Sequence, residues 1–124
     1  MSFLLLVHQR LAIAGILITL IVGIWGIVTY LRKRDATSGY RSTLVMTEVL
    51  FLVQALVGGL LFVAGDKRPH DSLHLLYGVL LVIALPIAGS YTSSQAPRRE
   101  PLFYGLVGLF MMGLSIRAIT TGAG

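Results

Sequence analysis

Residues 11–31 read LAIAGILITLIVGIWGIVTYL, a run of 21 residues without a charged side chain. A helix needs about 20 predominantly apolar residues to cross the hydrocarbon core of a bilayer. Apolar residues 3–7 extend this run, so a helix over residues 3–32 would be about 45 Å long and would tilt or project beyond the membrane. Its length, the basic cluster that follows it and the lack of a small-residue cleavage site argue against a signal peptide.

Three further apolar segments follow the first one. They cover residues 44–65, 73–92 and 102–119, and only a few polar side chains interrupt them. We predict helices at about residues 3–32, 42–65, 71–92 and 101–120. The connections are short, so each helix should run antiparallel to the one before it. The sequence therefore predicts an all-α fold, a four-helix transmembrane bundle of antiparallel hairpins that forms a single integral membrane domain.

The composition excludes several classes of protein. Of the 124 residues, 56% are hydrophobic and 12% are charged, whereas soluble domains carry about 25% charged residues. No cysteine is present, which excludes disulfides, thiolate metal sites and covalent c-type haem attachment. The chain also lacks a Gly-rich phosphate loop and the HExxH and GxSxG motifs, so we favour a non-catalytic protein.

The positive charge predicts how the chain lies in the membrane. The net charge of +5 comes from short connections, which favours contact with anionic lipid headgroups and no nucleic acid partner. The first and third connections hold six basic residues, namely Arg32, Lys33, Arg34, Arg41, Arg98 and Arg99. The opposite side holds four, namely Arg10, Lys67, Arg68 and Arg117. Basic residues are enriched on the cytoplasmic side, so we predict both termini outside and a multi-pass protein of the plasma membrane.

Small and polar residues mark one face of the first predicted helix. His8 lies on this face with residues that recur every three or four positions, namely Ala12, Gly15, Thr19, Val22, Gly23 and Gly26. Small residues let membrane helices pack closely, so His8 should face the bundle. On the third predicted helix, His74 shares a face with Gly78, Leu81, Leu85 and Gly89.

His8 and His74 are the leading candidates for a functional site, because an ionisable residue within a membrane segment usually has a function. Imidazole binds haem iron or copper. If Tyr30 and Tyr91 mark the inner interface, His8 and His74 lie about 33 Å and about 25 Å from it. That difference in depth leaves His70, in the turn before the third helix, as a competing partner for His8.

Three interpretations of the histidines therefore stay open, one of them a copper ion or another role. One haem b could bind between His8 and His74, with Arg117 placed to pair with the propionates. Alternatively, the histidines are interfacial side chains that water satisfies and that bind no ligand.

Glu48, Arg41 and Gln54 are the remaining polar candidates. A carboxylate within the membrane usually pairs with another group or moves protons. Arg41 shares a helix face with Glu48 but lies two turns away, so a partner from another helix is the alternative. Gln54 lies near mid-membrane, where we expect it to hydrogen-bond a neighbouring helix.

The layout of four helices with histidines at one end resembles the cores of small b-type membrane cytochromes. It is also similar to uncharacterised small bacterial multi-pass membrane proteins. Di-haem cytochromes of this group use a histidine pair near each membrane face, whereas here the histidines lie near the outer face, so the resemblance implies at most one haem b. The small multidrug transporters are similar in length and helix number, but their essential glutamate lies in the first helix and Glu48 lies in the second.

Three functions remain as hypotheses. The first is a non-catalytic accessory or redox subunit of a membrane complex, with one b-type haem between the first and third helices. The second is a proton-coupled small-molecule transporter that acts through Glu48. The third is a structural or assembly subunit without a ligand. All three place the protein in the lipid bilayer, with other membrane subunits or further copies of itself as partners.

Overall fold

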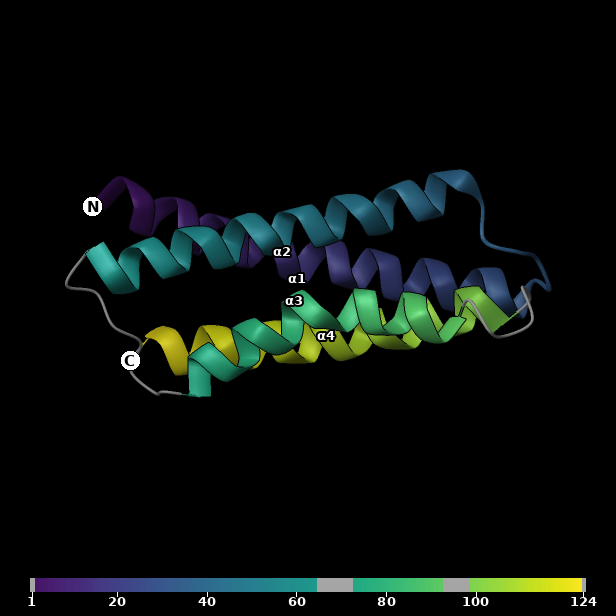
Figure 1. Cartoon of the computed structure of the whole chain (residues 1–124). Coiled ribbons are helices and arrows are strands. Elements are labelled where there is room, and N and C mark those ends of the chain that lie inside the picture. The colour runs from purple at the N-terminus through teal and green to yellow at the C-terminus, as the bar shows by residue number, and fades with distance from the viewer. Residues whose placement is uncertain (1, 65–72, 93–98, 124) are drawn as a thin grey trace.

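A computed structural model describes residues 2–64, 73–92 and 99–123 of the chain, which form four long helices (Figure 1). These are α1 (Ser2–Leu31), α2 (Ser38–Ala64), α3 (Leu73–Thr92) and α4 (Glu100–Ala123). All four are long and apolar enough to cross a membrane, and no strand occurs within the described ranges. The predicted all-α, four-helix transmembrane bundle is therefore confirmed.

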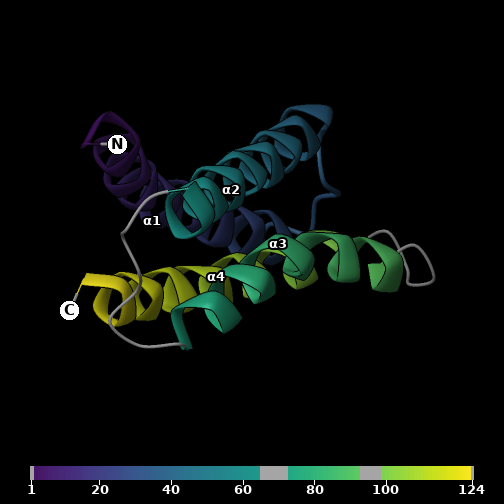
Figure 2. The ribbon, with the colours of Figure 1, turned by 60° about the vertical axis from the view of Figure 1, so that its left-hand side comes forward.

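The helices lie side by side in the cyclic order α1, α2, α3, α4. Helix α1 packs most extensively against α4, α3 packs against α4, and the contact between α2 and α3 is the smallest of the neighbouring pairs. Helices α1 and α3 are therefore diagonal partners across the bundle. Figure 2 shows that α1 and α2 are inclined to each other and that α1 is inclined to α3 and α4. Helix α1 begins and α4 ends at the same end of the molecule (Figure 1).

The connection between α1 and α2 is shorter than predicted because α2 begins at Ser38, about four residues early. Ser38 and Gly39 resemble loop residues in the sequence, but Thr37 caps the helix by accepting a hydrogen bond from the Tyr40 amide at 3.1 Å. Helix α1 ends where Lys33 adopts a left-handed φ of 58°. The Lys33 and Arg34 amides then return to the carbonyls of the last turn of α1.

Glycines let the backbones of α1 and α4 touch. A Cβ atom on Gly26 would lie 2.8 Å from the Cα of Gly105, and one on Gly108 would lie 2.9 Å from the amide nitrogen of Gly23. At distances this short, no side chain larger than the hydrogen atom of glycine fits between the two helices. The small-residue face predicted for α1 therefore faces α4 at Gly23 and Gly26, whereas at Gly15 it meets Phe51 of α2. Close packing of this kind drives helix association in lipid.

A buried tyrosine fixes the start of α2 against α1. Tyr40 is fully buried, and its hydroxyl donates a hydrogen bond to the carbonyl of Val22 at 3.0 Å. Its ring makes edge-to-face contacts with Trp25 and Tyr104, with centroids 5.1 and 6.5 Å apart. This aromatic cluster holds α1, α2 and α4 together at the end of the bundle opposite the histidines.

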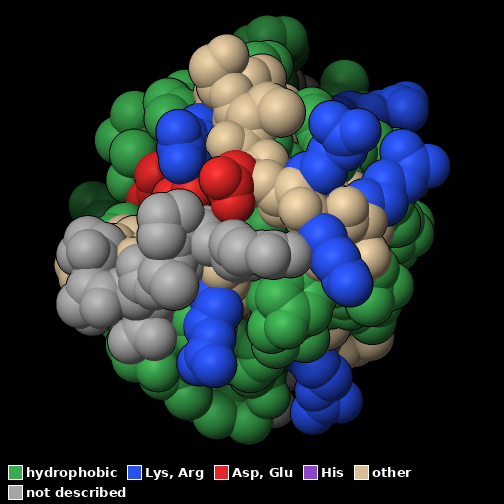
Figure 3. Space-filling model, turned by 90° about the vertical axis from the view of Figure 1, so that its right-hand side faces the viewer, with side chains coloured by type: hydrophobic (Ala, Val, Ile, Leu, Met, Phe, Trp, Pro, Cys, Tyr) green, Lys and Arg blue, Asp and Glu red, His purple; other side chains and the backbone are tan. Residues whose placement is uncertain are grey.

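That end of the molecule also carries most of the positive charge. Five exposed basic residues belong to it, namely Arg32, Lys33, Arg34, Arg41 and Arg99. Figure 3 views this end and shows Lys and Arg side chains spread around its rim, with acidic side chains on one side. The described residues at the other end contribute only Arg10 and Arg117. This separation of charge agrees with the predicted division of the basic residues, while the orientation in the membrane stays a prediction.

Candidate functional site

The structure brings His8 and His74 together across the diagonal of the bundle. Their ring centroids are 6.1 Å apart, and the ring planes make an angle of 72°. Both side chains are half-buried. The predicted difference in depth does not separate them, because α1 and α3 cross at an angle rather than lying parallel (Figure 2). His70, the predicted competitor, lies outside the described residues.

A hydrogen bond to α4 fixes the ring of His74. Its Nδ1 atom lies 2.7 Å from the carbonyl oxygen of Ala118. A carbonyl only accepts hydrogen bonds, so Nδ1 carries a proton, and in the neutral ring Nε2 then holds the lone pair. Histidines that bind metals commonly use a carbonyl in this way to fix the ring and its tautomer. Sequence analysis could not find Ala118, because its contribution comes from the backbone and not from the side chain.

Helix α2 holds His8 from the other side. The Gln54 side chain donates a hydrogen bond from Nε2 to the carbonyl oxygen of His8 at 2.8 Å, which confirms the predicted bond between Gln54 and a neighbouring helix. The ring of His8 lies against Gly58, where an added Cβ would meet its Cε1 atom at 3.0 Å. All four helices therefore contribute to the surroundings of the two histidines.

Several buried polar atoms near this site have no hydrogen-bond partner among the described residues. They are Nδ1 of His8, Oε1 of Gln54 and Oγ of Ser115, one turn before Ala118 on α4. An unsatisfied buried polar group costs about 1–3 kcal/mol, and native structures contain few of them. Three of the four such atoms in the described part of the chain therefore belong to the part of the bundle that holds the histidines.

The charged candidates lie apart from the histidines. Arg41 does not pair with Glu48. Its Nη2 atom instead contacts Oε1 of Glu100 at 2.6 Å, which joins the first turns of α2 and α4. Glu48 is half-buried on α2, and its Oε1 atom has no hydrogen-bond partner within the described part of the chain.

Arg117 lies at the histidine end of the bundle. It immediately precedes Ala118, whose carbonyl binds His74, and its own side chain is exposed. Its backbone carbonyl accepts a hydrogen bond from the hydroxyl of Thr120 at 2.9 Å. The structure therefore places Arg117 at the histidine end of the bundle, next to the carbonyl group that binds His74.

The donor set limits which metal could bind. In the described part of the chain, no group of three or more His, Asp or Glu side chains is arranged to hold a metal ion. Structural zinc sites use four protein ligands and catalytic ones use three. Two imidazoles fit better with a metal that brings its remaining ligands with it, as haem iron does.

The comparisons with known proteins give no relative. No family model matches the chain, and neither a curated protein nor a solved structure matches it significantly. Any functional conclusion therefore rests on the geometry of this molecule.

Proposed function

We propose that this small multi-pass membrane protein binds one haem b between α1 and α3 and carries electrons as a non-catalytic subunit. The observation that carries the proposal is the close approach of His8 and His74 from diagonal helices. Bonds between a metal and imidazole nitrogen are about 2 Å long. Two imidazole rings that bind opposite sides of one metal ion therefore have centroids about 6 Å apart. The observed 6.1 Å agrees with that requirement.

The residues around the two histidines support the proposal. His74 presents Nε2 because Ala118 binds Nδ1. His8 has a buried Nδ1 atom without a partner among the described residues, and its ring packs against Gly58, where a larger residue would crowd it. Arg117, next to Ala118, would pair with a propionate at the outer end of the bundle. A haem with two histidine ligands supplies reversible one-electron transfer.

An absorbance spectrum of the protein purified from membranes tests the proposal. We expect a Soret band and a sharp α band in the reduced protein. Both bands should be lost in His8→Ala and in His74→Ala, while Gln9→Ala, an exposed neighbour on α1, should retain them. Bands that survive in the double variant His8→Ala, His74→Ala would reject these ligands. A colourless protein that purifies in a fixed ratio with other membrane subunits would favour the structural-subunit hypothesis instead.

Glu48 supports a second candidate function, proton-coupled transport. A carboxyl oxygen buried in a membrane helix without a partner among the described residues is costly to ionise and is suited to carrying a proton. Reaction with a hydrophobic carbodiimide tests for such a protonated carboxyl, with Glu100 as the matched control because Arg41 already pairs with it. We expect modification of Glu48 that decreases at high pH and disappears in Glu48→Gln. Equal modification of Glu100, or none at Glu48, would reject this role.

A further inference from the structure

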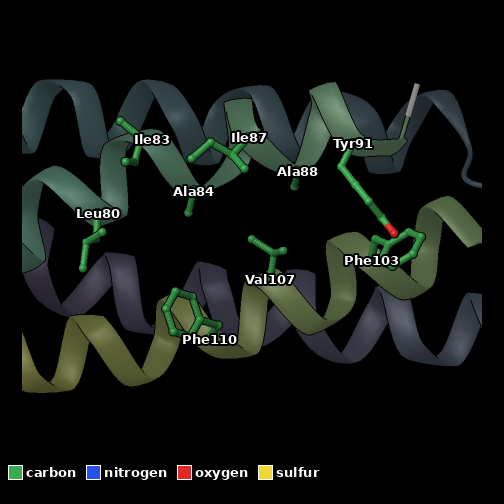
Figure 4. A pocket seen from close by; sticks show the side chains of 9 residues that line it. All are labelled: Leu80, Ile83, Ala84, Ile87, Ala88, Tyr91, Phe103, Val107 and Phe110. Atoms are coloured by element: carbon green, nitrogen blue, oxygen red, sulfur yellow. The ribbon is translucent and has the colours of Figure 1, made fainter. Parts of the chain in front are cut away.

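An apolar groove runs between α3 and α4, from Leu80, six residues after His74, to Tyr91 near the end of α3. Figure 4 shows side chains from both helices around it, and its volume is about 340 Å³. Ala84 and Ala88 lie one turn apart on α3, opposite Val107 and Phe110 of α4. Their short side chains leave the space between the two helices unfilled, so the groove follows directly from the sequence of α3.

One end of the groove reaches the basic end of the molecule. Tyr91, at the end of α3, and Phe103, at the start of α4, make an edge-to-face contact there, with centroids 4.8 Å apart. Both residues line the groove. Aromatic residues of this kind favour the level of the lipid headgroups, so the groove extends from the interface towards the middle of the membrane.

Arg99 immediately precedes α4 at the basic end of the molecule. It is four residues before Phe103, which lines the groove, and its side chain is exposed. The adjacent carboxylate of Glu100 is bound by Arg41 at 2.6 Å, so it does not neutralise Arg99. The groove therefore combines an apolar channel with a cation at the depth of the headgroups.

We propose that this groove binds an anionic phospholipid, with one acyl chain between α3 and α4 and the phosphate at Arg99. The acyl chain matches the wholly apolar lining, and the negative phosphate complements the basic end of the molecule. Basic pockets between membrane helices bind anionic headgroups by the same combination of charge and shape. A zwitterionic lipid places a positive group beside its phosphate and gains less from Arg99.

Quenching of tryptophan by brominated lipids tests the site in the full chain. Trp25 is the sole tryptophan, so Trp25→Phe with Phe110→Trp places one reporter at the groove. The protein is reconstituted in vesicles that contain brominated phosphatidylglycerol or brominated phosphatidylcholine. We expect a preference of about fivefold for phosphatidylglycerol, because a single surface cation contributes about that factor in affinity.

Variants separate the two parts of the site. In the reporter protein, Arg99→Gln should abolish the preference for phosphatidylglycerol, whereas Arg32→Gln, which removes another exposed cation from the same end, should retain it. Ala84→Leu, which narrows the groove, should weaken quenching by both lipids. Equal quenching by the two lipids in the reporter protein would overturn the proposal, as would a preference that survives Arg99→Gln. Unchanged quenching in Ala84→Leu would show that the acyl chain lies elsewhere.

Discussion

His8 and His74 face each other but are held in different ways. Nδ1 of His74 donates a hydrogen bond to the carbonyl of Ala118, and this bond fixes the orientation and the tautomer of the neutral ring. His8 is held through its backbone, by Gln54, and through the flat surface that Gly58 offers to its ring. The two rings are therefore positioned by different helices, His74 by α4 and His8 by α2.

The contact between Gly58 and His8 predicts a difference between two neighbouring glycines. A Cβ on Gly58 would press on the His8 ring at 3.0 Å, whereas one on Gly59 would meet no atom within 4 Å. Alanine is the better helix former by about 1 kcal/mol, so Gly59→Ala should be neutral or stabilising. Gly58→Ala should lose that gain and about 1–2 kcal/mol more, because overpacking forces neighbours to move.

Unfolding of the two alanine variants in detergent, followed by circular dichroism, measures this difference. Equal unfolding midpoints would show that the contact between Gly58 and the His8 ring does not limit the size of the side chain at position 58.

Tyr40 provides a second test at the level of a single side chain. Tyr40→Phe keeps the ring contacts with Trp25 and Tyr104 and removes only the hydrogen bond to Val22. The expected loss of stability is about 0.5–1.5 kcal/mol. Tyr40→Ala, which also removes a large buried ring, should cost about 3–5 kcal/mol. If both variants unfold at the same denaturant concentration, the ring does not anchor α2.

At the level of the helices, the contact between α1 and α4 is the closest in the bundle. Gly23, Gly26, Gly105 and Gly108 bring the two backbones together. Lipid offers no hydrophobic drive for this association, so the energy comes from packing over a short distance. Helix α4 therefore serves as the support on which both α1 and α3 are placed, and it carries the carbonyl that orients His74.

Two glycines of α4 test this role directly. A Cβ on Gly105 would lie 2.9 Å from the amide nitrogen of Ile27 and 3.0 Å from the carbonyl oxygen of Gly23, whereas one on Gly113 would meet nothing within 4 Å. Gly105→Ala should therefore destabilise the bundle by about 1–3 kcal/mol, and Gly113→Ala should be neutral or slightly stabilising. Thermal unfolding of both variants in the same detergent makes the comparison. A Gly105→Ala protein as stable as Gly113→Ala would contradict the close contact of α1 and α4.

Sequence patterns could predict the helices and the inward face of α1, because apolar length and the spacing of small residues depend only on local order. Gly15, Thr19 and Val22 are all buried as that spacing indicates. The pairing of Arg41 with Glu100 could not be predicted in this way, since 59 residues separate them along the chain. The hydrogen bond between His74 and the Ala118 carbonyl could not be predicted either, because every residue has a backbone carbonyl and the side-chain pattern does not distinguish this one.

At the level of the whole molecule, most of the basic residues and the histidines lie at opposite ends. The basic end carries the aromatic cluster and one end of the groove, and the other end carries the histidines. If the basic end faces the cytoplasm, as the excess of Lys and Arg predicts, the histidine site opens towards the outer surface. A haem there would exchange electrons with partners on that side or within the membrane.

The absence of cysteine from the chain makes this orientation measurable. Ser2→Cys places a thiol at the start of α1, and Asp35→Cys places one in the exposed connection before α2. The basic residues around that connection resist transfer across the membrane, so a membrane-impermeant maleimide should label Ser2→Cys in intact cells. The same reagent should label Asp35→Cys only after the cells are made permeable. The reverse pattern would place the histidine site on the cytoplasmic side, and labelling of both thiols in intact cells would mean that the chain inserts in two orientations.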